Sequence, residues 1–429
     1  MTLSWLSIVR LGLVQMALGA VVVLTTSTLN RLMVVELALP AVLPGFLIAL
    51  HYGIQITRPN WGFRSDTSGH RTRWIIGGMI ALALGAFGAT VGVLLFESSF
   101  ALAMTVSIAA YALIGVGVGA SGTSLLALLA TATAPHRRAA AATITWLMMI
   151  AGIAVTAGTV GAFLDPYTPA LLLRIVSYVT GGAILLTILA VWGVERDVCI
   201  QPQTGDKTTF IKGLREVWSE PAARKFTIFV FLSMTAYFMQ ELILEPYAGL
   251  VFGFTPGQST ALSGAQNGGV FLGMLTVGIV ATGLRRGSLR NWVTAGCIGS
   301  AGSLATISIL GGVANPVTLM PAVVCLGFFN GMFAVAAIGS MMALAARGRE
   351  AREGTRMGLW GAAQAVAAGF GGLLGAAAVD VMRIFTHSDA TAFGAVFLFE
   401  AALFVVAALL ALRVIEHNRG RHMAVVPGE

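Results

Sequence analysis

The 429-residue chain is 57% apolar and only 10% charged, and its mean hydropathy is +0.86. An ordinary soluble domain carries about 25% charged residues, so this composition excludes a soluble enzyme, and it also excludes a disordered chain, which needs low hydrophobicity. The formal net charge of +8 would suggest nucleic-acid binding in a soluble protein. Here the charges form short clusters between long apolar runs, which indicates a multi-pass membrane protein with no nucleic-acid partner.

Twelve apolar runs are long enough to cross a bilayer, which takes about 20 residues of α-helix. A polar stretch, Glu195–Lys225, separates the first six runs from the last six. We expect membrane-spanning helices at approximately 10–30, 38–57, 74–96, 101–126, 141–164, 170–193, 226–248, 261–284, 292–312, 317–345, 357–380 and 391–412.

The basic residues predict the orientation of these helices, because cytoplasmic loops are rich in Lys and Arg. If both termini are cytoplasmic, only Arg31, Arg174 and Arg383 of the 26 basic residues fall on the outer side. The polar stretch also spaces the apolar residues of Phe210–Trp218 as in a short interfacial helix. The predicted organisation is a six-helix bundle at 1–194, a cytoplasmic linker at 195–225, a second six-helix bundle at 226–415 and a cytoplasmic tail at 416–429.

Similar residues recur in the two groups of six helices at an offset of 214 residues. Arg10 corresponds to Arg224, each just before the first apolar run of its group. Asp165, at the end of the fifth run, corresponds to Asp380 at the end of the eleventh, one residue out of register. Several matches in equivalent places predict a parallel repeat of six helices.

The loop after the second run, GFRSDTSGHRTR, resembles the cytoplasmic loop motif of the major facilitator superfamily. The positions that match the motif are Gly62, Asp66, Gly69 and Arg71, whereas Thr67 and His70 replace basic residues. Glycine permits a tight turn, and Asp66 is suited to pair with a basic residue or a helix N-terminus of the other group and so hold one conformation. The alternative is a basic loop that only sets topology. With two repeats of six helices, the resemblance implies the major facilitator fold.

Several segments of the first group are distinctive. They are VQMALGA (Val14–Ala20), TLNRLMVVEL (Thr28–Leu37), LHYGIQ (Leu50–Gln55), RPNWGFRSD (Arg58–Asp66) and TRWIIGGM (Thr72–Met79). They resemble the PucC, or bacteriochlorophyll-delivery, family of purple phototrophic bacteria. The resemblance implies a light-harvesting assembly factor in the bacterial inner membrane, cytoplasmic or intracytoplasmic. It would bind bacteriochlorophyll as cargo rather than cofactor and deliver it to antenna polypeptides, with pigment-synthesis enzymes as further candidate partners and membrane lipid around it.

Two alternatives stay open at this point. One is a proton-coupled transporter of a hydrophobic small molecule, and the other is a non-catalytic accessory subunit of bacteriochlorophyll synthase. A membrane prenyltransferase needs clustered aspartates to hold magnesium diphosphate, but no DxxxD or NDxxD spacing occurs in this chain. The three cysteines also lack the spacing of a zinc site. We therefore expect no catalytic residues and no protein metal site.

Few ionisable groups fall within the apolar runs, and these are the candidate binding residues. His51 lies in the second run, with Gln55 one turn further on. A neutral imidazole can ligate the magnesium of a chlorin ring, and the alternative is a hydrogen bond to a neighbouring helix. Glu241 and Glu245 share one face of the seventh run, unless that helix ends early and leaves both in the interface. Glu400 lies near the middle of the twelfth run.

A cluster of glycines in the eleventh run has two interpretations. Its members are Gly369, Gly371, Gly372 and Gly375. Small residues allow close helix packing in membranes, which is the favoured interpretation. The other is a flat groove that faces the lipid and would suit a flat apolar pigment.

Overall fold

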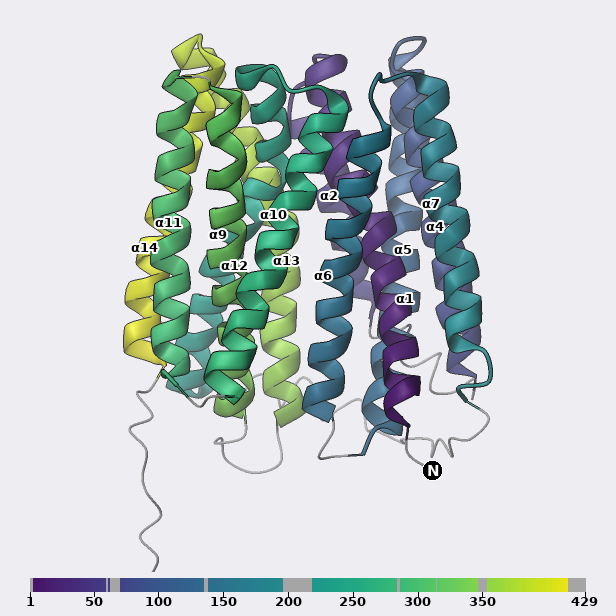
Figure 1. Ribbon diagram of the computed structural model, residues 1–429, viewed down its shortest axis with the longest axis vertical. Coiled ribbons are helices and arrows are strands. Elements are labelled where there is room, and N and C mark those ends of the chain that lie inside the picture. The colour runs from purple at the N-terminus through teal and green to yellow at the C-terminus, as the bar shows by residue number, and fades with distance from the viewer. Residues whose placement is uncertain are drawn as a thin grey trace, which may run out of the picture.

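The computed structural model is an all-helical bundle in which the helices stand side by side (Figure 1). It describes residues 3–58, 61, 70–134, 138–195, 218–283, 286–313, 315–345 and 353–415. The loop-motif positions Gly62, Asp66 and Gly69 lie outside the described residues. So do the predicted tail and, except for Trp218, the predicted interfacial helix.

Six helices come from the first half of the chain, which here means the described residues up to 195. The first helix continues through two π-helical turns, Leu24–Leu29 and Leu32–Glu36. The helices are α1 (Trp5–Val23), α2 (Val42–Ile54), α4 (Arg71–Leu95), α5 (Phe100–Ala132), α6 (Arg138–Phe163) and α7 (Pro169–Val191).

The second half of the chain, from residue 218, contributes another six helices. They are α9 (Pro221–Phe252), α10 (Pro256–Val277, extended by a π-helical turn at Gly278–Gly283), α11 (Leu289–Val313), α12 (Pro316–Ala345), α13 (Glu353–Thr386) and α14 (Asp389–Val414). Local sequence sets several of these ends. Gly253, with φ +70°, terminates α9, and Thr255 with Gln258 forms a capping box before α10.

Eleven helices in the described part of the chain are long and apolar enough to cross a membrane, so the protein is a multi-pass membrane protein. The exception among the twelve predicted spans is the second, where the helical stretch is only Val42–Thr57. At 1.5 Å per residue it reaches about 24 Å, less than the ~30 Å of a bilayer core. Pro40 and the positive φ of Ala38 break the helix before Val42. The structure therefore leaves the count of twelve spans a prediction.

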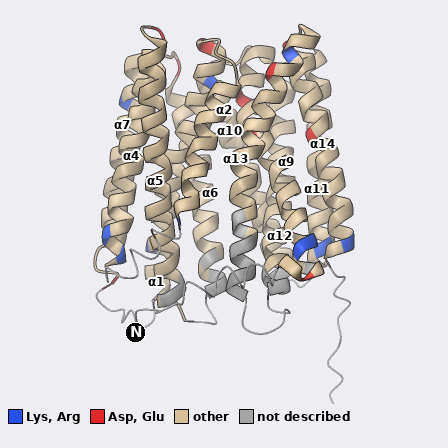
Figure 2. Ribbon diagram, turned by 180° about the vertical axis from the view of Figure 1, so that it is seen from behind, with Lys and Arg blue, Asp and Glu red and all other residues tan. Residues whose placement is uncertain are grey.

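Charged residues gather at the two ends of the bundle. We call the end that carries Trp5 the amino-terminal end and the opposite end, which carries Glu36 and Asp165, the distal end. In Figure 2 the larger groups of blue ribbon lie at the amino-terminal end, and fewer lie at the distal end. This distribution agrees with the basic clusters in the sequence. That the amino-terminal end faces the cytoplasm stays a prediction.

Each half of the chain has its own apolar core. One cluster of buried side chains runs from Leu3 to Val194, with Leu242 as its member from the second half. The other runs from Phe226 to Ile415. The principal contacts between the halves are made by α6 with α10 and by α2 with α13.

Glycine brings α6 and α10 into backbone contact. A Cβ atom added at Gly161 would lie 2.5 Å from the backbone nitrogen of Ala261, and one at Gly264 would lie 2.6 Å from that of Gly158. In a membrane, where apolar burial does not drive association, such close packing holds helices together. We call this α6–α10 contact the glycine seam.

The glycine cluster of α13 also lets neighbouring helices approach closely. Cβ atoms at Gly371 and Gly375 would each lie 2.7 Å from a backbone carbonyl of α9, those of Thr235 and Met239. Gly369 instead packs against Tyr52 of α2. The packing interpretation of this cluster is therefore confirmed for these three glycines, since each lies against a neighbouring helix and not in an open groove.

The seam predicts a difference between two glycines on one helix. Gly161→Ala should lower the stability by about 1–3 kcal/mol, because the new methyl group overlaps the α10 backbone. Gly158→Ala is the matched control, since a Cβ there meets nothing within 4 Å, and its melting temperature should stay at or slightly above that of the wild type. Thermal melting in detergent measures both. Equal destabilisation by the two substitutions would contradict the seam.

Candidate functional site between the two halves

A polar run in the first helix forms the centre of the contact between the halves. Residues 25–31, TTSTLNR, cover most of the first π-helical turn and the two residues that separate it from the second, and every one of them is buried. π-helical turns leave carbonyl groups off the regular ladder and are frequent at functional sites. Here the hydroxyl of Tyr111 on α5 donates to the Thr25 carbonyl at 3.2 Å, which satisfies one of them.

Side chains of this run reach α9 and α10 in the second half. The amide of Asn30 donates to the Leu242 carbonyl at 2.8 Å, and the hydroxyls of Thr28 and Thr260 lie 3.2 Å apart. The hydroxyl of Ser27 donates to the carboxylate of Glu245, which is 3% exposed. Glu245 therefore lies at the contact between the halves. Because α9 continues to Phe252, the alternative that this helix ends early is wrong.

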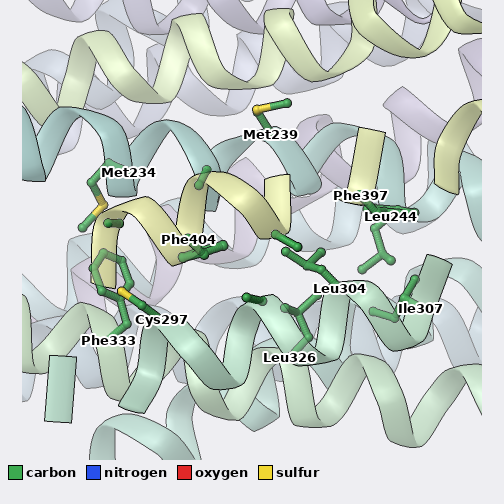
Figure 3. Close-up of a cluster of buried hydrophobic side chains, with 14 of the residues drawn as sticks. Met234, Met239, Leu244, Cys297, Leu304, Ile307, Leu326, Phe333, Phe397 and Phe404 are labelled. Carbon is green, nitrogen blue, oxygen red and sulfur yellow. The ribbon is translucent and has the colours of Figure 1, made fainter. Parts of the chain in front are cut away.

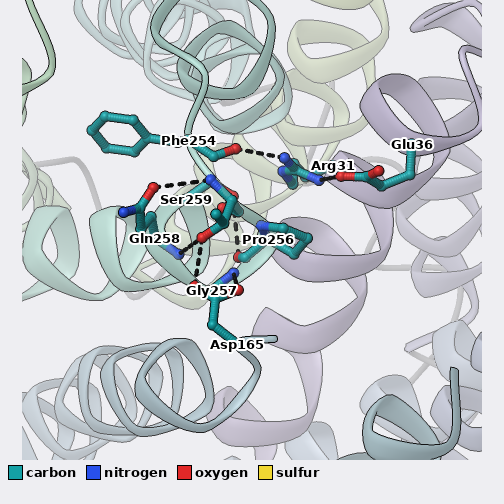
Figure 4. Close-up of polar contacts among 9 residues, drawn as sticks. Arg31, Glu36, Asp165, Phe254, Pro256, Gly257, Gln258 and Ser259 are labelled. Carbon is teal, nitrogen blue, oxygen red and sulfur yellow. Dashed lines mark hydrogen bonds and ion pairs between the residues drawn. The ribbon is translucent and has the colours of Figure 1, made fainter. Parts of the chain in front are cut away.

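Arg31 extends the contact toward the distal end (Figure 4). Its guanidinium is 2% exposed, lies 2.5 Å from Glu36 Oε1 and donates to the Phe254 carbonyl at 2.6 Å. It is also close enough to Glu245 to interact electrostatically. A buried guanidinium needs such partners, because its desolvation is costly. From the sequence Arg31 was only an exception to the basic pattern, whereas in the structure it binds the two halves together.

Asp165 and Asp380 form two equivalent contacts at the distal end. Asp165 follows α6 and accepts from the Thr255 hydroxyl at 2.5 Å and the Gly257 amide at 3.1 Å, where α10 begins (Figure 4). Asp380 on α13 accepts from the amides of Ala41 and Val42 at 3.1 and 2.7 Å, where α2 begins. Each carboxylate thus caps a helix N-terminus of the other half, where negative charge is favoured. We call the pair the aspartate clasp.

An aromatic group lies nearer the amino-terminal end of the same contact. The rings of Tyr52 on α2 and Phe238 on α9 are 5.9 Å apart, and Tyr237 stands edge-on to Phe238 at 5.2 Å. Glu241 lies one turn from Tyr237 and interacts electrostatically with Tyr237 and Tyr52. All four residues are only partly buried. We call them the aromatic–acid group. An aromatic surface with one carboxyl group suits a large apolar ligand that carries polar substituents.

His51 and Gln55 follow Leu47 and Ile48 of α2 at helical spacing, and those residues belong to the core of the first half. The imidazole of His51 also stacks on the ring of Tyr52, with 4.7 Å between the ring centroids. The imidazole is 1% exposed, and neither nitrogen has a hydrogen-bond partner among the described residues. Gln55 accepts from the Arg58 guanidinium. The structure therefore brings Glu241 and Glu245 to the contact between the halves, and it buries His51 beside Tyr52 of the aromatic–acid group.

The other two predicted positions also lie within one half. Glu400 is 0% exposed on α14, a helix that packs mainly against α11 and α9. Arg71 is 3% exposed at the start of α4, where its guanidinium donates to the Ala127 carbonyl at 2.9 Å and its amide donates to Glu195 at 2.8 Å. Among the described residues, no group of three or more His, Cys, Asp or Glu side chains is arranged to hold a metal ion.

Sequence reasoning missed most of the polar contacts between the halves, although one signal was available. Asp165 and Asp380 were recognised as equivalent positions of the repeat, and a repeat with its two copies in contact places equivalent residues at equivalent interfaces. The polar run at 25–31 was a second signal, because consecutive polar residues in an apolar helix need partners within the protein. Neither signal identified the partner helix.

Comparison with known proteins gives consistent results at the levels of sequence and fold. A family model described as PUCC protein matches residues 28–419. The chain is 66% identical to the bacteriochlorophyll synthase 44.5 kDa chain of Rhodobacter capsulatus over 100% of both chains. It is 27% identical to protein PucC of Rhodobacter capsulatus, over 96% of this chain and 92% of that one.

Two solved transporters share the fold. A POT family transporter in complex with a thioalcohol-conjugated peptide matches with a TM-score of 0.69 at 14% identity, over 95% of each chain. The nucleoside transporter NupG matches with a TM-score of 0.66 at 13% identity, over 96% of this chain and 100% of that one. Such low identities show the fold alone, which is that of the major facilitator transporters.

The aspartate clasp predicts the accessibility of the distal contact. Replacing Asp165 and Asp380 together by Ala should remove about 1 kcal/mol per cap, which increases the separated population by roughly 30-fold. Labelling of a Thr260→Cys residue by a maleimide, in a chain whose native cysteines are replaced by Ser, reports that population. A Ser98→Cys chain is the control and should label at an unchanged rate. An unchanged rate at position 260 would show that the clasp does not hold the halves together.

Proposed function

The chain belongs to the PUCC protein family, and on this premise we propose that it binds bacteriochlorophyll in a photosynthetic membrane and delivers it to light-harvesting polypeptides without catalysing a reaction. The observation that carries the proposal is the full-length 66% identity to a protein named as a chain of bacteriochlorophyll synthase. The match to protein PucC over 96% of the chain supports it. Pigment and antenna polypeptides are its proposed partners.

The proposed pigment site is the aromatic–acid group between α2 and α9. A chlorin is a large, flat, mainly apolar ring with carbonyl substituents. Tyr52, Tyr237 and Phe238 offer ring faces for stacking, and a protonated Glu241 offers a donor to a carbonyl group. His51, one residue from Tyr52 and with both nitrogens unpartnered among the described residues, is the proposed ligand for the ring magnesium once the imidazole is uncovered, with Gln55 beside it.

The predicted topology completes this proposal. In it, the short helix α2 serves as the twelfth span, and both termini face the cytoplasm of a bacterial inner membrane. The domain boundaries at 194/195, 225/226 and 415/416 are part of the same proposal, as is a second contact at the amino-terminal end made by the Asp66 loop. Opening at the amino-terminal end would then expose the aromatic–acid group on the side where pigment is synthesised, while the aspartate clasp holds the distal end.

A non-catalytic accessory subunit of bacteriochlorophyll synthase is the second candidate function. The printed name of the 66% identical relative favours it. The two candidates differ in the polypeptides that should accompany the chain, which are antenna polypeptides in one case and the prenyl-transferring enzyme in the other. The alternative of proton-coupled transport rests on the shared fold and on the partly exposed carboxyl group of Glu241.

Purification of the intact chain from phototrophic cells in a mild detergent tests the proposal. We expect bacteriochlorophyll in the absorption spectrum of the purified protein and antenna polypeptides in its mass spectrum. A preparation with the synthase enzyme and no antenna polypeptide would favour the accessory subunit. Repeated preparations with neither pigment nor any photosynthetic polypeptide would contradict both candidates, and proton-driven uptake of a solute by vesicles would then favour transport.

The aromatic–acid group predicts which residues hold the pigment. Tyr52→Ala combined with Phe238→Ala should weaken pigment binding about 30-fold and lower the pigment bound per protein accordingly, because each ring contributes roughly 1 kcal/mol of contact. Phe163→Ala is the matched control, since this ring is 71% exposed at the distal end of α6, and its pigment content should be unchanged. The measurement is the ratio of pigment to protein absorbance. Equal pigment in all three proteins would place the site elsewhere.

A further inference from the structure

The second half of the chain contains a layer of buried polar residues that the proposed pigment site does not use. Four helices, α9, α11, α12 and α14, pack around it. Each contributes one polar side chain that is at most 1% exposed. The four residues are Gln240, Ser300, Asn330 and Glu400.

Apolar contacts on either side of the layer fix its depth. Toward the amino-terminal end, the ring of Phe333 lies 6.4 Å from that of Phe229 and 6.0 Å from that of Phe404, which joins α9, α12 and α14. Toward the distal end, Tyr247 contacts Phe397 at 5.0 Å and joins α9 to α14. The hydroxyl of Tyr247 also donates to the Ile307 carbonyl of α11 at 2.7 Å.

Figure 3 shows the same order along the helices, with Cys297 and Phe333 at one end of the apolar cluster and Ile307 and Phe397 at the other. Helical spacing then places the polar residues. Ser300 falls between Cys297 and Leu304, Asn330 between Leu326 and Phe333, and Glu400 between Phe397 and Phe404.

In each of these helices the polar residue is three or four positions from both flanking apolar residues, so all three share one face. Gln240 lies seven residues before Tyr247 and shares its face of α9. The four polar side chains thus lie within about one helical turn of the same depth.

The layer contains both hydrogen-bond donors and hydrogen-bond acceptors that lack partners among the described residues. The Ser300 hydroxyl donates to Asn330 Oδ1 at 2.7 Å, which leaves Asn330 Nδ2 as a donor without a partner among the described residues. Gln240 Oε1 and both oxygens of Glu400 are acceptors without a partner there. Among the described residues, neither oxygen of Glu400 is bonded to a basic side chain, and burial of an unpaired carboxylate is costly.

We propose that Glu400 is a resident proton-binding site, in which a permanently neutral carboxyl group completes the layer. The atoms concerned have no other partner among the described residues. With the side chains turned toward one another, the hydroxyl of Glu400 donates to Gln240 Oε1, and its carbonyl oxygen accepts from Asn330 Nδ2. A chain of hydrogen bonds then runs from Ser300 through Asn330 and Glu400 to Gln240 and connects all four helices. The bound species is a proton that the chain acquires from water before the helices close, and no covalent bond changes.

The titratable groups around the layer are consistent with a proton that stays on Glu400. The other titratable groups on the inward faces of these helices are Cys297, one turn toward the amino-terminal end, and Tyr247, whose hydroxyl is already engaged. Glu241 follows Gln240 directly and so points about 100° away around α9, toward Tyr52. Among the described residues, no basic side chain is bonded to Glu400.

Infrared difference spectroscopy of the full-length purified protein tests the protonation state. The spectrum of the wild type minus that of Glu400→Gln, both at pH 8, should show the carbonyl stretch of a neutral carboxylic acid. The Glu97→Gln protein is the control, because Glu97 is exposed, and its difference spectrum should show carboxylate bands instead. Carboxylate bands in the Glu400→Gln difference spectrum would overturn the proposal.

Thermal melting of the same proteins tests the hydrogen bonds. Glu400→Gln keeps one donor and one acceptor in the same shape, so its melting temperature should fall by less than about 2 °C. Glu400→Ala leaves Asn330 and Gln240 unpaired and creates a cavity. The melting temperature of this protein should therefore fall by about 5 °C or more. If Glu400→Ala does not fold, the melting temperature of Glu400→Gln is by itself the test of the proposal. A large loss of stability in Glu400→Gln would contradict a neutral, hydrogen-bonded Glu400.

Discussion

The structure depends on how the two halves of the chain hold each other at the distal end without a hydrophobic driving force. Lipid is as apolar as the helices, so the halves associate through close packing and hydrogen bonds. The glycine seam provides backbone contact between α6 and α10, and the aspartate clasp adds charged caps on α10 and α2. Arg31 adds a third connection, to the carbonyl that follows α9. These contacts lie toward the distal end, and further toward the amino-terminal end the halves meet through apolar side chains, with Ile150 of α6 packed against Val270 and Met274 of α10.

Polar and aromatic residues divide the contact between the halves into two regions. The distal region is buried and hydrogen-bonded, from Ser27 with Glu245 to Asn30 with the Leu242 carbonyl. The region nearer the amino-terminal end has partly exposed rings and one carboxyl group, Glu241. A polar solute would need more fixed hydrogen-bond partners than this second region provides, whereas a flat apolar pigment needs ring faces. On the proposed function, this division lets a transporter fold serve a pigment-related role, because function resides in the site and not in the fold.

The few buried acids have distinct surroundings and therefore distinct chemistry. Glu245 accepts from the Ser27 hydroxyl and lies near the guanidinium of Arg31, so its carboxyl group is engaged across the two halves. Glu400 has neither, and the amides of Gln240 and Asn330 share its depth in the second half. The two carboxyl groups, each within an apolar helix, thus differ in the polar groups that surround them.

The sequence by itself determined the membrane class, the approximate positions of the helices and the family, because apolar runs and distinctive segments are local features. It also identified Asp165 and Asp380 as equivalent positions. Only the tertiary structure decided that each of these acids caps a helix of the other half, that Arg31 is buried at the contact between the halves, and that Tyr52 contacts Phe238 of the second half while His51 stacks on Tyr52. An apolar helix in lipid carries little amphipathic pattern, so the sequence does not tell which face meets protein. Partner choice depends instead on where glycines let backbones approach and where buried polar atoms find each other.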